Sequence, residues 1–151
     1  SPTVVLDAAH NPHGAEAVAA ALEDSFAFSP LIGVLGVMAD KDHEGLLAAL
    51  EPQLAHVVCT QNSTPRALPA HELAVAARAV FGDDRVSVAP RLEDALDQAT
   101  TLAEAGGFKS KHKMSFADCF AAALAKQQKA LLLTGDPEFK QVEQEITINW
   151  L

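Results

Sequence analysis

Short apolar runs alternate with segments of helical periodicity over residues 1–107, and this alternation limits the fold more than any other feature of the sequence. The apolar runs fall at residues 3–6, 31–37, 55–60 and 86–88, and each is followed by apolar residues at helical spacing. Strands that alternate with helices form βαβ units, which join parallel strands and place helices on the faces of the sheet. The sequence therefore predicts an α/β fold, a three-layer α/β/α sandwich with a mainly parallel sheet.

Residues 108–151 differ from the preceding residues in their basic side chains. Before residue 108 there are four Arg and one Lys, whereas the six basic residues after it are all Lys. No fold requires such a change of cation, so it indicates a junction near residues 105–113 between sequences of different origin. A chain of 151 residues is long enough to enclose one core, and we expect a single chimeric domain over residues 1–151.

The second segment is predicted to complete the sandwich with a helix and two strands. Ser115, with Asp118 three residues later, is typical of a capping box at the start of a helix. We expect the preceding helix to break at glycines 106–107, because glycine is a poor helix former. Residues 131–134 are expected to form a buried parallel strand. Residues 146–150 alternate between apolar and polar, which favours an antiparallel strand at an edge of the sheet.

Charge and hydropathy argue against several kinds of partner. The formal net charge of −9 disfavours binding to nucleic acid phosphates. No apolar run approaches the roughly 18 residues of a membrane span and no charged-then-apolar leader opens the sequence, so we expect no membrane partner and a cytoplasmic location. Cys59 and Cys119 form no metal-binding pair and are expected to be reduced. The one partner considered is a second copy of the chain, paired through an exposed edge strand.

Two loops, at residues 7–12 and 40–42, follow predicted strands of the first segment. Ligands of parallel sheets bind at the carboxyl ends of the strands, where both loops are expected. Asn11 suits the cap position of the next helix, and Pro12 suits its first position. Asp7 and His10 precede this helix N-terminus, where backbone N–H groups favour an anion. They contribute either to a substrate site or, in the simpler interpretation, to a strand-to-helix turn in which Asp7 caps backbone donors.

The motifs LDAAHNP and GVLGVMADKD, at residues 6–12 and 33–42, resemble the C-terminal domain of folylpolyglutamate synthase/dihydrofolate synthase, of the ATP-dependent Mur ligase family. The resemblance covers about residues 1–105. It implies a ligase that joins glutamate to a folate through an acyl phosphate, with Asp7 contacting ATP and His10 close to the incoming amino acid. The family's ATPase domain carries a GxxxxGK[ST] loop, which this sequence lacks, so we expect an incomplete ligase site.

Residues 108–151 resemble the last third of a PIN-domain ribonuclease of the VapC toxin type. The resemblance lies in KHKMSFADCFAAALA, LLLTGDPEFK and ITINWL. That family cleaves RNA with Mg²⁺ or Mn²⁺ held by carboxylates, which are the ligands that such cations prefer. The resemblance implies that Asp118 and Asp136 are remnants of this metal site. Both also suit helix caps. Asp7 would complete the metal cluster if the first strands of the two folds superpose.

These observations together lead us to expect an engineered chimeric α/β scaffold that is not an enzyme, has no native catalytic activity and needs no cofactor. Asp7 and His10 are then vestiges of a ligase site, and Asp118, Asp136 and Asp7 are vestigial metal candidates. Two alternatives stay open: a weak Mg²⁺- or Mn²⁺-dependent ribonuclease, and a module that binds nucleotide or glutamate weakly. A natural gene fusion is the alternative to an engineered origin.

Overall fold

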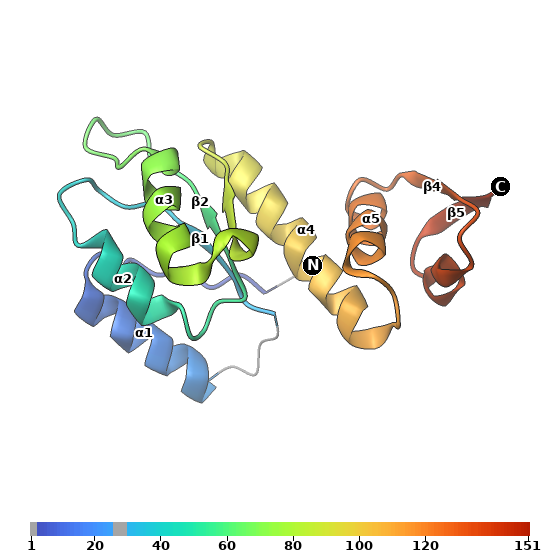
Figure 1. Cartoon of the computed structure of the whole chain (residues 1–151), viewed down its shortest axis with the longest axis horizontal. Coiled ribbons are helices and arrows are strands. Elements are labelled where there is room, and N and C mark those ends of the chain that lie inside the picture. Colours follow the sequence, from blue (N-terminus) through green and yellow to red (C-terminus); the bar gives the residue numbers. More distant parts are fainter. Residues whose placement is uncertain (1–2, 26–29) are drawn as a thin grey trace. The chain divides into compact units, whose positions relative to one another are not determined.

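The computed structural model describes residues 3–25 and 30–151, which divide into two compact units. The first unit spans Thr3–Ala99 and the second Thr100–Leu151. Figure 1 traces both along the chain, and each unit is described by itself below. The α/β class with parallel sheets is confirmed. The described strands nevertheless form two separate sheets, whereas one was expected.

The first unit alternates helices with the strands of a parallel three-stranded sheet. In chain order its elements are α1 (Pro12–Ser25), β1 (Ile32–Leu35), α2 (His43–Leu50), β2 (His56–Cys59), α3 (Ala70–Phe81), the 3₁₀ turn η1 (Asp83–Arg85), β3 (Val86–Val88) and the first turns of α4 (Leu92–Lys111). The strand order is β1-β2-β3, with every pair parallel. These bounds confirm the predicted strands near residues 31–37, 55–60 and 86–88.

The core of the first unit gathers around the central strand β2. Val57, Val58 and Cys59 are fully buried there. From α2 and α3, Leu47 and Leu73 are among the largest fully buried side chains of the molecule. The apolar run of β2 matches the pattern of a strand covered by neighbours, which is why its position could be predicted from hydropathy.

The predicted strand at residues 3–6 is wrong. Residues 3–10 form neither helix nor strand, and Leu6 is 90% exposed. Among the described strands, β1 is hydrogen-bonded on one edge only, to β2. A short apolar run has strand propensity but does not itself supply a pairing partner, so tertiary contacts decide whether it joins a sheet.

The second unit contains the rest of α4, then α5 (Phe116–Gln127), β4 (Leu131–Thr134), the 3₁₀ segment η2 (Pro137–Val142) and β5 (Thr147–Trp150). The expected break at glycines 106–107 is wrong, because α4 continues to Lys111. Its buried face, which includes Ala105 and Phe108, packs into the apolar cluster of this unit with residues such as Met114, Cys119 and Val142. This burial offsets the poor helix propensity of the two glycines.

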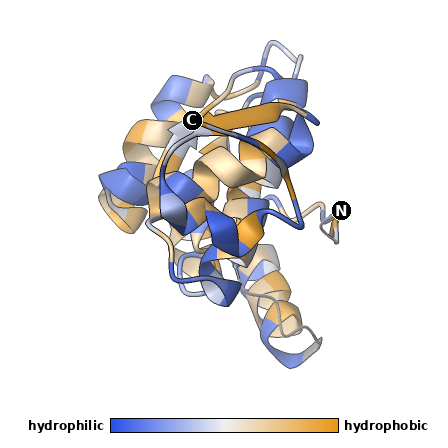
Figure 2. Ribbon diagram, turned by 90° about the vertical axis from the view of Figure 1, so that its right-hand side faces the viewer, coloured by the Kyte–Doolittle hydropathy of each residue, from blue (hydrophilic) through white to orange (hydrophobic). Residues whose placement is uncertain are grey.

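The pairing of the last two strands also corrects the prediction. β5 runs parallel to β4, from Leu131 opposite Thr147 to Thr134 opposite Trp150, so the antiparallel direction expected for residues 146–150 is wrong. β4 is hydrophobic along its leucines (Figure 2), yet it is not buried as expected, because Leu131 and Leu133 are each 58% exposed. A segment between two strands that includes a helix or 3₁₀ turn permits parallel pairing, and here η2 makes that connection.

Candidate functional site

The loops that follow β1 and β2 are hydrogen-bonded to each other at the carboxyl ends of these strands. The backbone N–H of Leu68 donates to the Val37 carbonyl at 2.8 Å, and the N–H of Ala39 donates to the Arg66 carbonyl at 2.8 Å. The Arg66 guanidinium also forms an ion pair of 2.7 Å with Asp40. The end of the sheet therefore carries a polar rim that is held in place by main-chain hydrogen bonds.

The charge of Asp40 is stabilised within this rim. Desolvation acts to raise its pKa, but a backbone hydrogen bond and the hydrogen bond and charge of Arg66 outweigh that effect and lower the pKa below its usual value. Residues 40–42 were predicted as a loop at a strand end. Arg66 was missed, because its position in a long loop after β2 gives no sequence signal that it meets Asp40.

The N-termini of α1 and α2 lie next to each other beside this rim. Asn11 Oδ1 accepts a hydrogen bond of 2.8 Å from Gly14 N, so Asn11 caps α1 as predicted. Asp42 Oδ1 accepts one of 2.9 Å from Gly45 N and caps α2. A Cβ atom at Gly45 would lie 2.7 Å from Pro12 Cγ, so the helices approach closely at this point. Two adjacent helix N-termini provide a region where negative charge is favoured.

Asp7 and His10 lie in the exposed segment that leads into α1. Asp7 Oδ1 accepts a hydrogen bond of 2.7 Å from Ala9 N. His10 Nδ1 lies 3.1 Å from the Ala8 carbonyl oxygen. When Nδ1 carries the proton it donates to this carbonyl, and Nε2 then faces outward as an acceptor. Asp7 therefore caps the backbone N–H of Ala9, as the simpler interpretation expected.

Asp7 also lines a cavity of about 180 Å³ within the first unit. Apolar residues of α1, β1 and α2 form most of its wall, and Val5 and Ala9 complete it from the N-terminal segment. On the strand side the wall extends past the carboxyl end of β1, to Gly36 and Val37. Asp7 therefore shares a cavity with residues along the whole length of β1, and its role in a ligand site stays a prediction.

The proposed metal candidates of the second unit lie at the starts of helical segments, where Ser115 caps α5 and Asp136 caps η2. Asp118 Oδ2 accepts a hydrogen bond of 2.6 Å from Ser115 Oγ, whose oxygen caps α5 by accepting from Asp118 N. Asp136 Oδ1 accepts from Glu138 N at 2.9 Å, at the start of η2. Within residues 3–25 and 30–151, no three His, Cys, Asp or Glu side chains lie close enough together to hold a metal ion. The metal site expected at Asp7, Asp118 and Asp136 is not supported by this arrangement, and it stays a prediction.

These features define a Rossmann-like α/β domain with a polar site at the carboxyl ends of its parallel strands. The family model described as "Mur ligase, glutamate ligase domain" matches residues 1–108. The chain belongs to this family.

The similar proteins are folate enzymes. The dihydrofolate synthase/folylpolyglutamate synthase of Mycobacterium tuberculosis is 54% identical over 104 residues, which are 69% of this chain and 21% of that protein. The structure of the M. tuberculosis folylpolyglutamate synthase complexed with ADP superposes with a TM-score of 0.70 at 50% identity, covering 73% of this chain and 25% of that one. The Thermotoga maritima folylpolyglutamate synthase gives a TM-score of 0.57 at 32% identity, over 62% and 22%. The chain thus spans about a fifth to a quarter of the length of these relatives.

This sequence similarity corrects the expected function. An engineered scaffold without native activity is the wrong interpretation, because identity of this extent to natural folate ligases indicates a native ligase domain. The comparisons give no support to the PIN-domain resemblance of residues 108–151 or to a chimeric origin. No helix in the described ranges has the length and apolar character needed to cross a membrane.

Proposed function

We propose that the first unit is the domain of an ATP-dependent folate ligase that helps to place glutamate for attachment to the folate. The observation that carries this proposal is the 54% identity to the M. tuberculosis dihydrofolate synthase/folylpolyglutamate synthase. In this proposal Asp7 contributes to the ATP side of the site and His10 lies close to the incoming amino acid. Their position before two adjacent helix N-termini supports the proposal, because both substrates carry anionic groups.

The chemistry proposed for this domain is positioning. In a ligase of this kind the amine attacks the acyl phosphate, the amide bond forms, and inorganic phosphate and a proton leave. Holding the two reactants in the correct geometry supplies a large part of the rate enhancement. In the tautomer that carries its proton on Nδ1, His10 Nε2 can accept a hydrogen bond from the ammonium or amine of the amino acid. The second carboxylate oxygen of Asp7 can accept one from a ligand hydroxyl or amine. Ligation also requires an ATPase site, which we propose that another domain supplies.

A domain exchange tests this function. The corresponding C-terminal domain of the M. tuberculosis folylpolyglutamate synthase is replaced by residues 1–107 of this chain, and addition of glutamate to a folate is measured. We expect the hybrid enzyme to form polyglutamates, and we expect His10→Ala to raise KM for glutamate more than KM for ATP. His13→Ala is the matched control, because His13 is an exposed histidine of α1 whose ring is 3.8 Å from Glu16. A correctly folded hybrid without ligase activity would contradict the proposal.

For residues 108–151 the PIN-domain resemblance stays a prediction, and we assign no activity to Asp118 or Asp136. Asp118 accepts a hydrogen bond from Ser115, the N-cap of α5, and Asp136 is itself the N-cap of η2. We likewise propose that the isolated chain is not by itself a complete enzyme, because it covers about 21% of the M. tuberculosis relative.

A further inference from the structure

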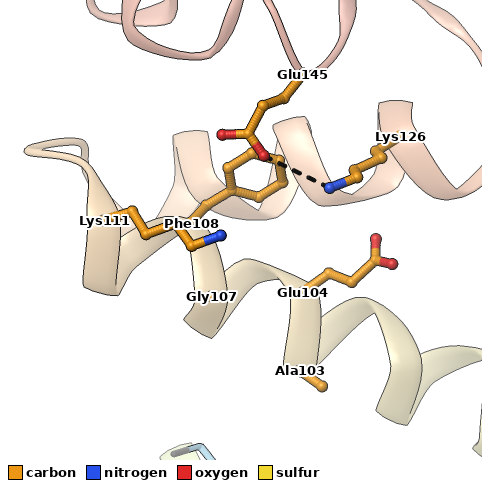
Figure 3. A pocket seen from close by; sticks show the side chains of 7 residues that line it. All are labelled: Ala103, Glu104, Gly107, Phe108, Lys111, Lys126 and Glu145. Carbon is orange, nitrogen blue, oxygen red and sulfur yellow. Dashed lines mark ion pairs between the residues drawn. The ribbon is translucent and has the colours of Figure 1, made fainter. Parts of the chain in front are cut away.

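The second unit contains a cavity of about 350 Å³ that no part of the proposed ligase site uses. Seven residues line it: Ala103, Glu104, Gly107, Phe108, Lys111, Lys126 and Glu145. Figure 3 shows α4 along one side of the cavity, with Lys126 of α5 and Glu145 on the other. On α4, Glu104, Gly107, Phe108 and Lys111 follow the spacing i, i+3, i+4, i+7, so they form a single stripe along one face of the helix.

Glu104 lacks the partner that its buried position requires. Its Oε2 atom is buried and accepts no hydrogen bond from any residue that the structure describes. In Figure 3 the Glu104 carboxylate extends from α4 toward the same space as the Lys126 ammonium. A buried carboxylate oxygen without a hydrogen bond is unfavourable, and a donor in the cavity would relieve this cost.

The other carboxylate of the cavity is already paired. Glu145 Oε1 lies 3.0 Å from His112 Nε2, and Glu145 Oε2 lies 3.6 Å from Lys126 Nζ. Lys126 Nζ also lies over the Phe108 ring, 5.2 Å from its centroid. These contacts pair Glu145 with Lys126 and His112. Glu104 is therefore the carboxylate of the cavity that keeps a buried oxygen without a hydrogen bond among the described residues.

Lys111 places a positive charge at the other end of the stripe. It is exposed and its charge helps to lower the pKa of Glu145, but within the described part of the chain no ion pair of 4.0 Å or less joins the two side chains. Lys111 lies seven positions after Glu104 on α4, which corresponds to a rise of about 10 Å along the helix axis. The stripe between them is apolar: Phe108 is 3% exposed, and a Cβ added at Gly107 would meet no atom within 4 Å.

We propose that this cavity binds a small extended zwitterion, an ω-amino carboxylate. Its ammonium donates to Glu104, its carboxylate pairs with Lys111, and its methylene chain lies over Gly107. Because the two residues lie about two turns apart on α4, the cavity favours ligands whose charges stand several bonds apart. An α-amino acid, whose charges are adjacent, cannot reach both ends.

Calorimetric titration of the full 151-residue chain with 6-aminohexanoate tests the proposal. Hexanoate and hexylamine keep the chain length and each remove one charge, and glycine keeps both charges but removes the spacing. We expect saturable binding of 6-aminohexanoate and at least tenfold weaker binding of the other three compounds. Binding of hexanoate or hexylamine as tight as that of 6-aminohexanoate, or no binding of any of the four, would overturn the proposal.

Two variants locate the ligand. Glu104→Gln keeps the side-chain shape and removes the charge, so it should weaken 6-aminohexanoate binding at least tenfold and leave the weak binding of hexanoate unchanged. Glu143→Gln, an exposed glutamate outside the cavity, should behave as the unsubstituted chain. Gly107→Leu should abolish binding by filling the cavity, whereas Gly107→Ala should retain it, with folding of each variant followed by amide NMR spectra. Unchanged binding in Glu104→Gln or in folded Gly107→Leu contradicts the assignment.

Discussion

Arg85 is expected to contribute more to the stability of the first unit than any surface ion pair. Its guanidinium donates to Glu51 Oε1 at 2.6 Å, to the Leu54 carbonyl at 2.5 Å and to the Ala55 carbonyl at 3.3 Å, and it stacks 5.1 Å from the centroid of the Phe81 ring. The Arg85 and Glu51 side chains are about one-third exposed, which weakens the ion pair by screening. Hydrogen bonds from a charged donor contribute about 1.5–3 kcal/mol each when buried. With that discount, Arg85→Met should cost about 2–3 kcal/mol.

Arg78→Met provides the matched control for this prediction. Arg78 approaches Asp83 only to 3.9 Å, and both side chains are exposed, so its loss should cost less than about 0.5 kcal/mol. Urea unfolding, followed through the amide signals of Val57 and Val58, reports on the first unit alone. A loss of 2–3 kcal/mol shifts the midpoint by roughly 1–2 M for an ordinary dependence on urea. Equal shifts for the Arg85 and Arg78 variants would refute the reasoning.

Three further predictions concern the first unit. Burial, and to a smaller extent the charge of Arg85, lowers the pKa of His56 below 6.5, so the unfolded chain binds more protons than the folded chain as the pH falls. The contribution of His56 to stability should be full above pH 6.5 and should fall as the pH drops below it. Urea unfolding at several pH values measures this, and His56→Gln should remove the dependence. Gly45→Ala should destabilise the first unit by about 1–2 kcal/mol despite the better helix propensity of alanine, because the new Cβ would lie 2.7 Å from Pro12 Cγ. Thermal unfolding measures this, and a stabilised variant would contradict the close approach of the two helices. Burial raises the pKa of the Cys59 thiol to about 11, so iodoacetamide at pH 8 should modify Cys59 only when urea unfolds the chain. Peptide mass spectrometry measures this modification, and rapid modification of the folded chain would contradict the burial of Cys59.

The candidate ligase site could be found from the sequence because its parts are local. Asp7, His10, Asn11 and Pro12 are consecutive or nearly so, and the cap that Asn11 provides to Gly14 depends only on residues within one turn. The pairing of Asp40 with Arg66 could not be predicted in the same way. These residues are brought together by hydrogen bonds between two loops, and neither loop has a periodic pattern that fixes its path.

The sequence by itself determined the helices and the three paired strands of the first unit, because hydrophobic periodicity and capping residues act between near neighbours. It also determined the start of α5 at Ser115, through a hydrogen bond that spans three residues. Only the tertiary structure decided that residues 3–6 stay outside the sheet, that β5 runs parallel to β4, and that Glu104, Lys126 and Glu145 line one cavity. Strand pairing and side-chain convergence depend on contacts between segments distant in the chain, and local propensity does not encode these contacts.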